Sequence, residues 1–255
     1  MTLEETVRRI TPLDQEAMEA AEKHWNSIAK PLHSLGKLED VVVQIAGIQG
    51  TSRVEIARKA LIVLCADNGV VEEGVTQTGQ EVTAQVAENF LQEKATAGIL
   101  CRRTGAEIFP VDMGIYRDTC IRNCKIAYGT KNMAKEPAMT RDQAVKALET
   151  GIMLAFEKKE EGFQLLATGE MGIGNTTSSS AMASVLLNHP VEEMTGRGAG
   201  LSTAGLNKKI KTIRRAIAMH KPDREDPVDV LSKVGGFDIA GMTGVFLGGA
   251  AAKMP

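Results

Sequence analysis

Three short runs of the chain are hydrophobic at consecutive positions instead of alternate ones. They cover Ala60 to Ala66, Ala106 to Val111 and Phe163 to Ala167. A strand that is buried on both faces, as in a parallel sheet, shows this continuous pattern, whereas a half-exposed strand alternates. The three runs therefore predict three buried, parallel strands.

Segments with apolar residues at helical spacing lie before, between and after these runs. Asp14 is placed to cap the first of them, and Thr140 with Gln143 forms a capping box. The predicted helices run from Asp14 to Pro31, Ser34 to Gly50, Gln80 to Arg103, Thr140 to about Glu161, Thr176 to Leu187, over the cations Lys208 to Arg215, and from Ile239 to Ala252.

Strands that alternate with long helices predict an α/β fold with right-handed crossovers. We expect a mainly parallel sheet with helices on both faces, Rossmann-like in its three layers, plus a small helical subdomain. Residues 1–52 would form the amino-terminal helices, and residues 53–255 the core. The two predicted helices before the first strand would serve as a subdomain or oligomerisation arm, or simply cover the sheet.

Two stretches depart from this rhythm. Residues 114–139 are polar and long for a loop, so they would form a lid or contain a hairpin. After the last predicted helix, the alternation of strands and helices predicts another strand at Lys253-Met254-Pro255. The sequence thus reads as part of a longer protein with an apparently truncated core, or as a sheet completed by another route.

The most distinctive stretch follows the third predicted strand. It reads Gly169-Glu170-Met171-Gly172-Ile173-Gly174-Asn175-Thr176-Thr177 and leads into a helix. Glycines allow close backbone approach, and a helix start offers free N–H groups and a positive dipole end, which suits a phosphate. Glu170 would lie at the carboxyl edge of the sheet, where α/β proteins bind ligands. The simpler alternative is a tight turn with a solvated glutamate.

Other carboxylates reach the same predicted edge. Asp67 follows the first strand and Asp112 the second. A second glycine cluster, Thr195 to Gly200, precedes a helix rich in cations, one of which could reach back to a phosphate held at Gly172 and Gly174. Asp67 would contact a substrate or cap the turn at Gly69.

Composition narrows the function further. The net charge of -2 offers no basic field for nucleic acid, and no apolar run is long enough to span a membrane. Four cysteines without metal spacing, and no secretory signal, predict a cytoplasmic protein with reduced thiols. Four scattered histidines predict neither a metal site nor a hydrolytic triad. A P-loop is missing, and the loop lacks the third spaced glycine of the dinucleotide fingerprint.

Seven ordered blocks, spread over nearly the whole chain, resemble one family. They are Lys30-Pro31-Leu32 with Ser34 to Glu39, Ala66 to Val70, Glu72 to Val75, Gln80 to Gln85, Gly169 to Thr177, Gly196 to Leu201, and Val230-Leu231 with Gly235 to Gly241. The chain resembles the nicotinate-nucleotide:dimethylbenzimidazole phosphoribosyltransferases of cobamide lower-ligand assembly. The resemblance implies transfer of 5-phosphoribosyl from nicotinate mononucleotide to 5,6-dimethylbenzimidazole or a related base, by a homodimer without metal or cofactor.

The resemblance also implies roles for individual residues. The 5′-phosphate would be cradled by Gly172, Ile173, Gly174, Asn175 and Thr176, helped by Lys209 and the backbone at Gly198. Glu170 would face the ribose or the nicotinate and is the candidate catalytic group. The acceptor base would be bordered by Thr78, Gln85 and Asp67.

Two departures from the family pattern bear on this prediction. Many members have Asp-His-Gly where this chain has Asp67-Asn68-Gly69. The family's proposed general base is a glutamate in a Leu-Gly-Glu-Gly segment beyond the last residue of this chain. The alternative is therefore a non-catalytic nucleotide- or benzimidazole-binding homologue, or a subunit that needs a partner chain for its catalytic base.

Overall fold

The fold is built on one parallel sheet, as the apolar runs predict. The computed structural model describes residues 1–92 and 94–255. In that part of the chain the sheet has four strands in the order β3-β2-β1-β4, and every neighbouring pair is parallel. The strands are β1 (Lys59–Ala66), β2 (Ala106–Gly114), β3 (Arg122–Asn123) and β4 (Leu165–Met171). The prediction of an α/β fold with a mainly parallel sheet is confirmed.

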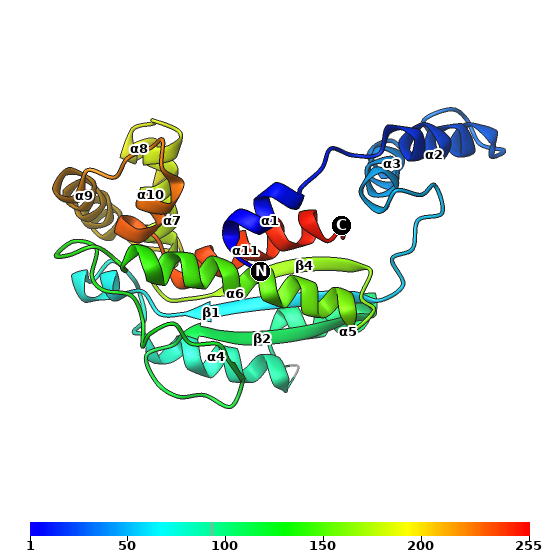
Figure 1. Ribbon diagram of the computed structural model, residues 1–255. Helices are drawn as coiled ribbons and strands as arrows, with labels where there is room; N and C mark the ends of the chain where they lie inside the picture. Colours follow the sequence, from blue (N-terminus) through cyan, green and yellow to red (C-terminus); the bar gives the residue numbers. More distant parts are fainter. Residues whose placement is uncertain (93) are drawn as a thin grey trace.

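Helices cover both faces of the sheet, which confirms the three layers (Figure 1). One face carries α6 (Arg141–Glu160) and α11 (Phe237–Ala251), and the other carries α4 (Glu81–Leu91) and α5 (Thr96–Thr104). Glycines bring α6 and α11 very close: a Cβ on Gly151 would lie 2.0 Å from the carbonyl oxygen of Gly241. The predicted capping box at the start of α6 is present, with Thr140 and Gln143 bonded reciprocally.

The predicted helix from Gln80 to Arg103 is two helices instead. The backbone N–H of Lys94 donates to the carbonyl of Asn89 (3.2 Å) and closes the end of α4, and α5 begins at Thr96. One residue of the predicted helix, at position 93, lies outside the described residues. The polar run after Leu91 ends the apolar face that a continuous helix would need.

Residues 114–139 form neither a lid nor a hairpin. Their short strand β3 pairs parallel to β2 at Val111 and Asp112, and the chain then follows β2, with Ile126 N–H donating to the Met113 carbonyl (3.0 Å). Lys125 makes a buried ion pair with Asp112 (2.8 Å). The first half of this loop is therefore fixed to the edge of the sheet, and its end is fixed to α10 (Pro227–Val234), where Met139 N–H donates to the Ser232 carbonyl (2.9 Å).

Strand pairing moves the third predicted strand along the sequence. It was expected over Phe163 to Ala167, yet β4 begins at Leu165 and ends at Met171, because it stays in register with β1 as far as the pair of Cys65 and Met171. Glu170 is consequently the penultimate residue of the strand. Because β4 lies at the edge of the sheet and none of its residues is fully buried, the prediction of a strand buried on both faces is wrong for β4. The helix that follows, α7 (Asn175–Leu186), starts one residue before the predicted Thr176.

Two groups of helices extend from the core (Figure 1). Next to the carboxyl ends of the strands, a lobe contains α7, α8 (Val191–Met194), α9 (Thr203–His220) and α10. At the other end, α2 (Gln15–Ser27) and α3 (Lys37–Gln49) form a projecting hairpin. Asp14 caps α2 as predicted, but α3 begins at Lys37 and not at Ser34, because residues 31–36 form turns.

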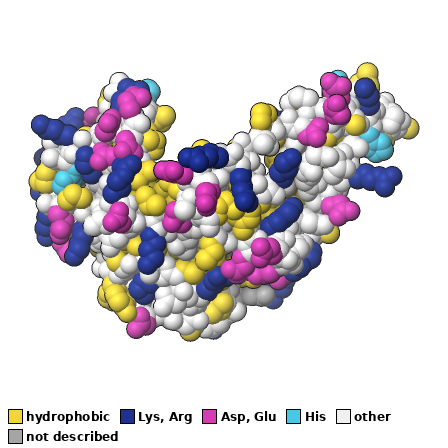
Figure 2. Space-filling model, viewed as in Figure 1, with side chains coloured by type: hydrophobic (Ala, Val, Ile, Leu, Met, Phe, Trp, Pro, Cys, Tyr) yellow, Lys and Arg dark blue, Asp and Glu magenta, His cyan; other side chains and the backbone are white. Residues whose placement is uncertain are grey.

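The amino terminus itself belongs to the core. Helix α1 (Leu3–Arg9) lies on α6 and α11, and the Leu3 N–H donates to Glu149 Oε1 (3.0 Å). Together the lobe and the hairpin leave a broad hollow on this side of the molecule, with hydrophobic side chains along it (Figure 2). In the described part of the chain, no helix is long and apolar enough to cross a bilayer.

Candidate functional site

The glycine loop between β4 and α7 requires its glycines. Gly174 has a φ of +96°, and a Cβ on Gly172 would lie only 2.3 Å from the Ala66 carbonyl oxygen. Two of the loop amides already have acceptors: Ile173 N–H donates to Thr83 Oγ1 (3.1 Å) and Asn175 N–H to the Gly172 carbonyl (3.1 Å). Among the described residues, Gly174 and Thr176 have no acceptor for theirs. Those two amides at a helix start remain available to an anion.

A buried ammonium group faces this loop. Lys209 on α9 is 1% exposed, and its Nζ donates to Thr176 Oγ1 (2.8 Å) and to the Gly196 carbonyl (3.3 Å). No carboxylate pairs with it in the described part of the chain. Burial lowers the pKa of Lys209. An unpaired buried cation is costly, so the site is prepared for an anionic ligand.

The two glycine clusters and the segment after β1 enclose one small pocket of about 100 Å³. A hydrogen bond from Gln77 Nε2 to the Gly200 carbonyl (2.6 Å) links its two sides. The pocket brings together most residues that the sequence assigns to phosphate and acceptor: Thr78, Gly172, Ile173, Gly174, Asn175, Thr176 and Gly198. Lys209 reaches the same place from behind, because a Cβ on Gly198 would lie 3.6 Å from its Nζ.

Glu170 lies beside this pocket at the end of β4. The Asn175 side-chain amide donates one hydrogen bond to Glu170 Oε2 and another to Asp238 Oδ2 (2.9 Å). Partial burial raises the pKa of Glu170, and the bond from Asn175 opposes that rise. A carboxylate with a raised pKa, open to solvent and near an anion site, is suited to accept a proton.

The other two predicted acceptor residues lie outside the pocket lining. Asp67 is fully buried; its Oδ2 accepts from the Tyr116 N–H (3.0 Å), and its Oδ1 has no partner among the described residues. Burial raises the pKa of Asp67. It does not cap the turn at Gly69, whose N–H donates to Thr130 Oγ1 (3.1 Å). Gln85 is exposed on α4, and no hydrogen bond given for the described residues joins it to the site.

Sequence reasoning missed three polar residues of the site. Thr83 holds the Ile173 amide, Asp238 shares the Asn175 amide with Glu170, and Asn68 Oδ1 accepts from Ser178 Oγ (3.1 Å). Asn68 and Asp238 fall in blocks that carry the family resemblance, which was the only signal for them. Thr83 falls in the Gln80 to Gln85 block of the resemblance, but its role in holding the loop has no local sequence pattern.

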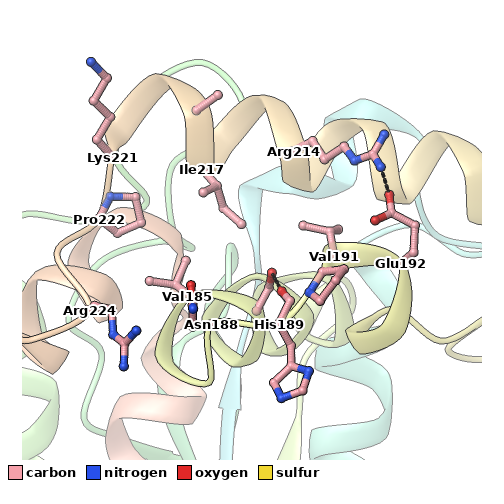
Figure 3. Close-up of a pocket in the computed structure, with 13 residues that line it drawn as sticks. Val185, Asn188, His189, Val191, Glu192, Arg214, Ile217, Lys221, Pro222 and Arg224 are labelled. Carbon is pink, nitrogen blue, oxygen red and sulfur yellow. Dashed lines mark hydrogen bonds and ion pairs between the residues drawn. The ribbon is translucent and has the colours of Figure 1, made fainter.

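A second, wider cleft of about 620 Å³ lies among α7, α8 and α9 (Figure 3). Arg214 and Glu192 form an ion pair at one side of it, and Lys221, Pro222 and Arg224 lie at the other. None of the predicted site residues lines this cleft. In the described part of the chain, His, Cys, Asp and Glu form no group of three or more that could hold a metal ion.

Comparisons with known proteins show the family to which the chain belongs. Residues 10–255 match a family model, DBI_PRT, described as phosphoribosyltransferase. The nicotinate-nucleotide–dimethylbenzimidazole phosphoribosyltransferase of Clostridium tetani is 48% identical over 99% of this chain and 71% of its own length. That of Ruminiclostridium cellulolyticum is 50% identical over 100% and 73%. The crystal structure of CobT from Thermus thermophilus superposes with a TM-score of 0.88 at 36% identity, covering 94% of this chain and 73% of that one.

Proposed function

This chain belongs to the nicotinate-nucleotide–dimethylbenzimidazole phosphoribosyltransferase family, and we propose that it carries out that transfer at the pocket between the two glycine clusters. The donor is nicotinate mononucleotide and the acceptor is 5,6-dimethylbenzimidazole or a related base. The products are α-ribazole 5′-phosphate and nicotinate, formed in cobalamin nucleotide-loop assembly. The relatives named above are transferases, which does not favour the alternative of a binding protein without turnover.

The environment of Lys209 is the observation that locates the phosphate site. Among the described residues its buried ammonium group has only neutral partners, Thr176 Oγ1 and the Gly196 carbonyl, and it is bonded to the residue whose own amide, like that of Gly174, has no acceptor there. A 5′-phosphate bound there gains charge-assisted hydrogen bonds and removes the cost of the unpaired charge. The phosphate therefore anchors the donor at the start of α7.

From that anchor, the ribose extends towards Glu170, and nicotinate leaves from the face of C1′ opposite the incoming acceptor. A pyridinium leaving group already carries positive charge, so it departs as neutral nicotinate ring nitrogen without metal assistance. The bond from C1′ to the acceptor nitrogen forms while the bond from C1′ to the pyridinium nitrogen breaks. The azole N–H loses its proton to a carboxylate; the resemblance gives this role to a glutamate beyond the last residue of this chain, and Glu170 is the candidate within it. Placement of both substrates and proton removal are the main contributions of the protein.

The acceptor base lies on the side of the pocket formed by residues 75–78. Thr78 lines this side directly. Gln85, exposed on α4, and Asp67, buried directly after β1 with one carboxyl oxygen that has no partner among the described residues, contribute further polar groups on the acceptor side. Which of these residues contact the acceptor depends on the shape of the base that is bound.

The working form is a homodimer in the cytoplasm. The α2–α3 hairpin supports the dimer, because its apolar side chains Ile28, Leu32, Leu35, Leu38 and Val41 are between 41% and 67% exposed. A face of this kind on a projecting hairpin suits contact with another chain. All four cysteines are free, which agrees with a reducing compartment.

Product analysis tests the function. The protein is incubated with nicotinate mononucleotide and 5,6-dimethylbenzimidazole, and nicotinate and α-ribazole 5′-phosphate are quantified chromatographically. Transfer predicts equal amounts of both products, each absent without the acceptor base. Release of nicotinate without the riboside phosphate would indicate hydrolysis, and no reaction despite donor binding would favour a binding protein.

A further inference from the structure

A second carboxylate is built into the site behind Glu170. Asp238 stands in the first turn of α11 and is 0% exposed. It is joined to Glu170 by one side chain: the two hydrogens of Asn175 Nδ2 are given to Glu170 Oε2 and to Asp238 Oδ2 (2.9 Å). The other oxygen of Asp238 accepts from the Ile239 N–H (3.0 Å).

Two glycines leave the space that the Asp238 carboxylate occupies. A Cβ on Gly172 would lie 2.7 Å from Asp238 Oδ2, and a Cβ on Gly236 would lie 2.4 Å from Asp238 Oδ1. Among the described residues no lysine or arginine pairs with this carboxylate. Burying a carboxylate without a cation is unfavourable, and an apolar or amide side chain would fill the same space at lower cost. The arrangement therefore points to a chemical role.

The shared amide explains what that role is. Asn175 Nδ2 can only donate, so its position between two carboxylates fixes its rotamer and directs one hydrogen at each of them. We propose that Asp238 is a positioning residue for the transfer reaction, which holds the Asn175 amide and through it orients the Glu170 carboxylate towards the acceptor. This inference rests on the proposed role of Glu170.

The electrostatics of the pair agree with this geometry. Burial, and then the charge of Glu170, raise the pKa of Asp238 to about 7, while the bond from Asn175 opposes the rise. The ionisable groups that face Asp238 in the described structure are Glu170 on β4 and the buried Cys65 thiol on β1. Because like charges disfavour one another, Glu170 ionises first, and Asp238 stays neutral while Glu170 titrates.

The kinetic test uses Asp238→Asn. The variant should bind nicotinate mononucleotide with unchanged affinity, because the phosphate site is intact. Its kcat should fall by about 10- to 100-fold, the usual loss when a residue that orients a reactive group is removed. The acid limb of its kcat/KM profile should keep its midpoint, because Asp238 is neutral at the pH values where Glu170 titrates. The matched control is Asp226→Asn, which alters an exposed carboxylate paired with Arg141 and should change neither quantity. Equal losses of donor binding and kcat would reduce Asp238 to a structural residue.

A titration separates this inference from the proposed function. Carbon-detected NMR of the carboxyl groups should show the Asp238 midpoint falling by about half a pH unit or more in Glu170→Gln, whether or not the protein turns over, because the charge of Glu170 is then gone. An unchanged midpoint would overturn the inference, whereas a shifted midpoint without transfer would overturn only the reaction assigned to the site. If Asp238→Asn does not fold, Asn175→Ala cuts the same bridge, and the Glu170 midpoint should then rise because its donor is lost.

Discussion

Lys209 Nζ lies 2.8 Å from Thr176 Oγ1 and so joins the middle of α9 to the first turn of α7. The contact places a buried positive charge at a helix start that already attracts anions. The phosphate site therefore consists of two parts that are distant in sequence, the glycine loop and one lysine. Separate experiments can test the phosphate site, the carboxylates beside it and the packing that positions them.

Removal of the Glu170 carboxylate should separate binding from catalysis. In Glu170→Gln, kcat should fall by about 10²- to 10⁴-fold, the usual contribution of a general base, with the donor Kd nearly unchanged. Burial raises the pKa of Glu170, and a base must be deprotonated to act, so wild-type activity should decline as pH falls through that raised pKa. Steady-state kinetics over pH measure both effects. An unaltered kcat in Glu170→Gln would exclude this residue as the base.

Gly172 should tolerate no side chain. In Gly172→Ala the added methyl would meet the Ala66 carbonyl oxygen at 2.3 Å and Asp238 Oδ2 at 2.7 Å. Because the first of these is backbone inside the sheet, we expect a loss of about 1–3 kcal/mol in the free energy of unfolding. Gly196→Ala is the control, since a Cβ there meets nothing within 4 Å. Urea unfolding of both variants measures the difference, and equal stabilities would contradict the packing described here.

The sequence predicts those parts of the site whose residues are close together along the chain. Gly172 to Thr176 and Glu170 form one continuous stretch, so local pattern was sufficient to place a phosphate loop beside a carboxylate. Lys209 was assigned through the family resemblance, and the structure supplies the contact. Asp238 is 63 residues from Asn175. No periodicity predicts that contact, because it arises when α11 packs across β1 and β4.

Strand limits were harder to predict than strand identity. The apolar run that marks β4 ends at Ala167, but hydrogen bonding to β1 continues through Glu170 and Met171. Pairing with a neighbour, which depends on the whole sheet, sets the end of a strand. For the same reason the sequence predicts a lid or hairpin after Gly114, whereas Arg122 and Asn123 pair parallel to β2.

Thr83 should be needed to hold the glycine loop. Thr83→Val keeps the shape of the side chain but leaves the Ile173 N–H without its acceptor, which should cost about 1–3 kcal/mol of stability and weaken donor binding. Thr243→Val is a suitable control, because that hydroxyl is exposed and bonds only to the Ile239 carbonyl of its own helix. Thermal unfolding and calorimetric titration with the donor follow both effects. If the loop did not depend on Thr83, Thr83→Val would match the wild type in stability and donor affinity, as Thr243→Val should.

Stability should depend on pH through Asp238. Its pKa is about 7 in the folded protein, and about 3.9 is usual for an unfolded chain. A raised carboxyl pKa means that the stability it contributes is fully present below about pH 4 and is lost as pH rises through about 7, by at most ~1.4 kcal/mol per pH unit. Asp238→Asn should therefore show a flatter decline in the free energy of unfolding between about pH 5 and pH 8. Identical slopes in urea unfolding would show that Asp238 is not held neutral in the fold.

The most direct measurement compares nicotinate mononucleotide with nicotinate riboside, which lacks only the phosphate, by calorimetric titration of the wild type and Lys209→Met. The wild type should bind the mononucleotide about 10- to 100-fold more tightly, as a charge-assisted contact implies, and Lys209→Met should lose most of that preference. Lys208→Met, which changes the exposed neighbour, should retain it. Equal affinity of the wild type for both ligands, or an undiminished preference in Lys209→Met, would contradict the assignment of this pocket as the phosphate site of a phosphoribosyltransferase.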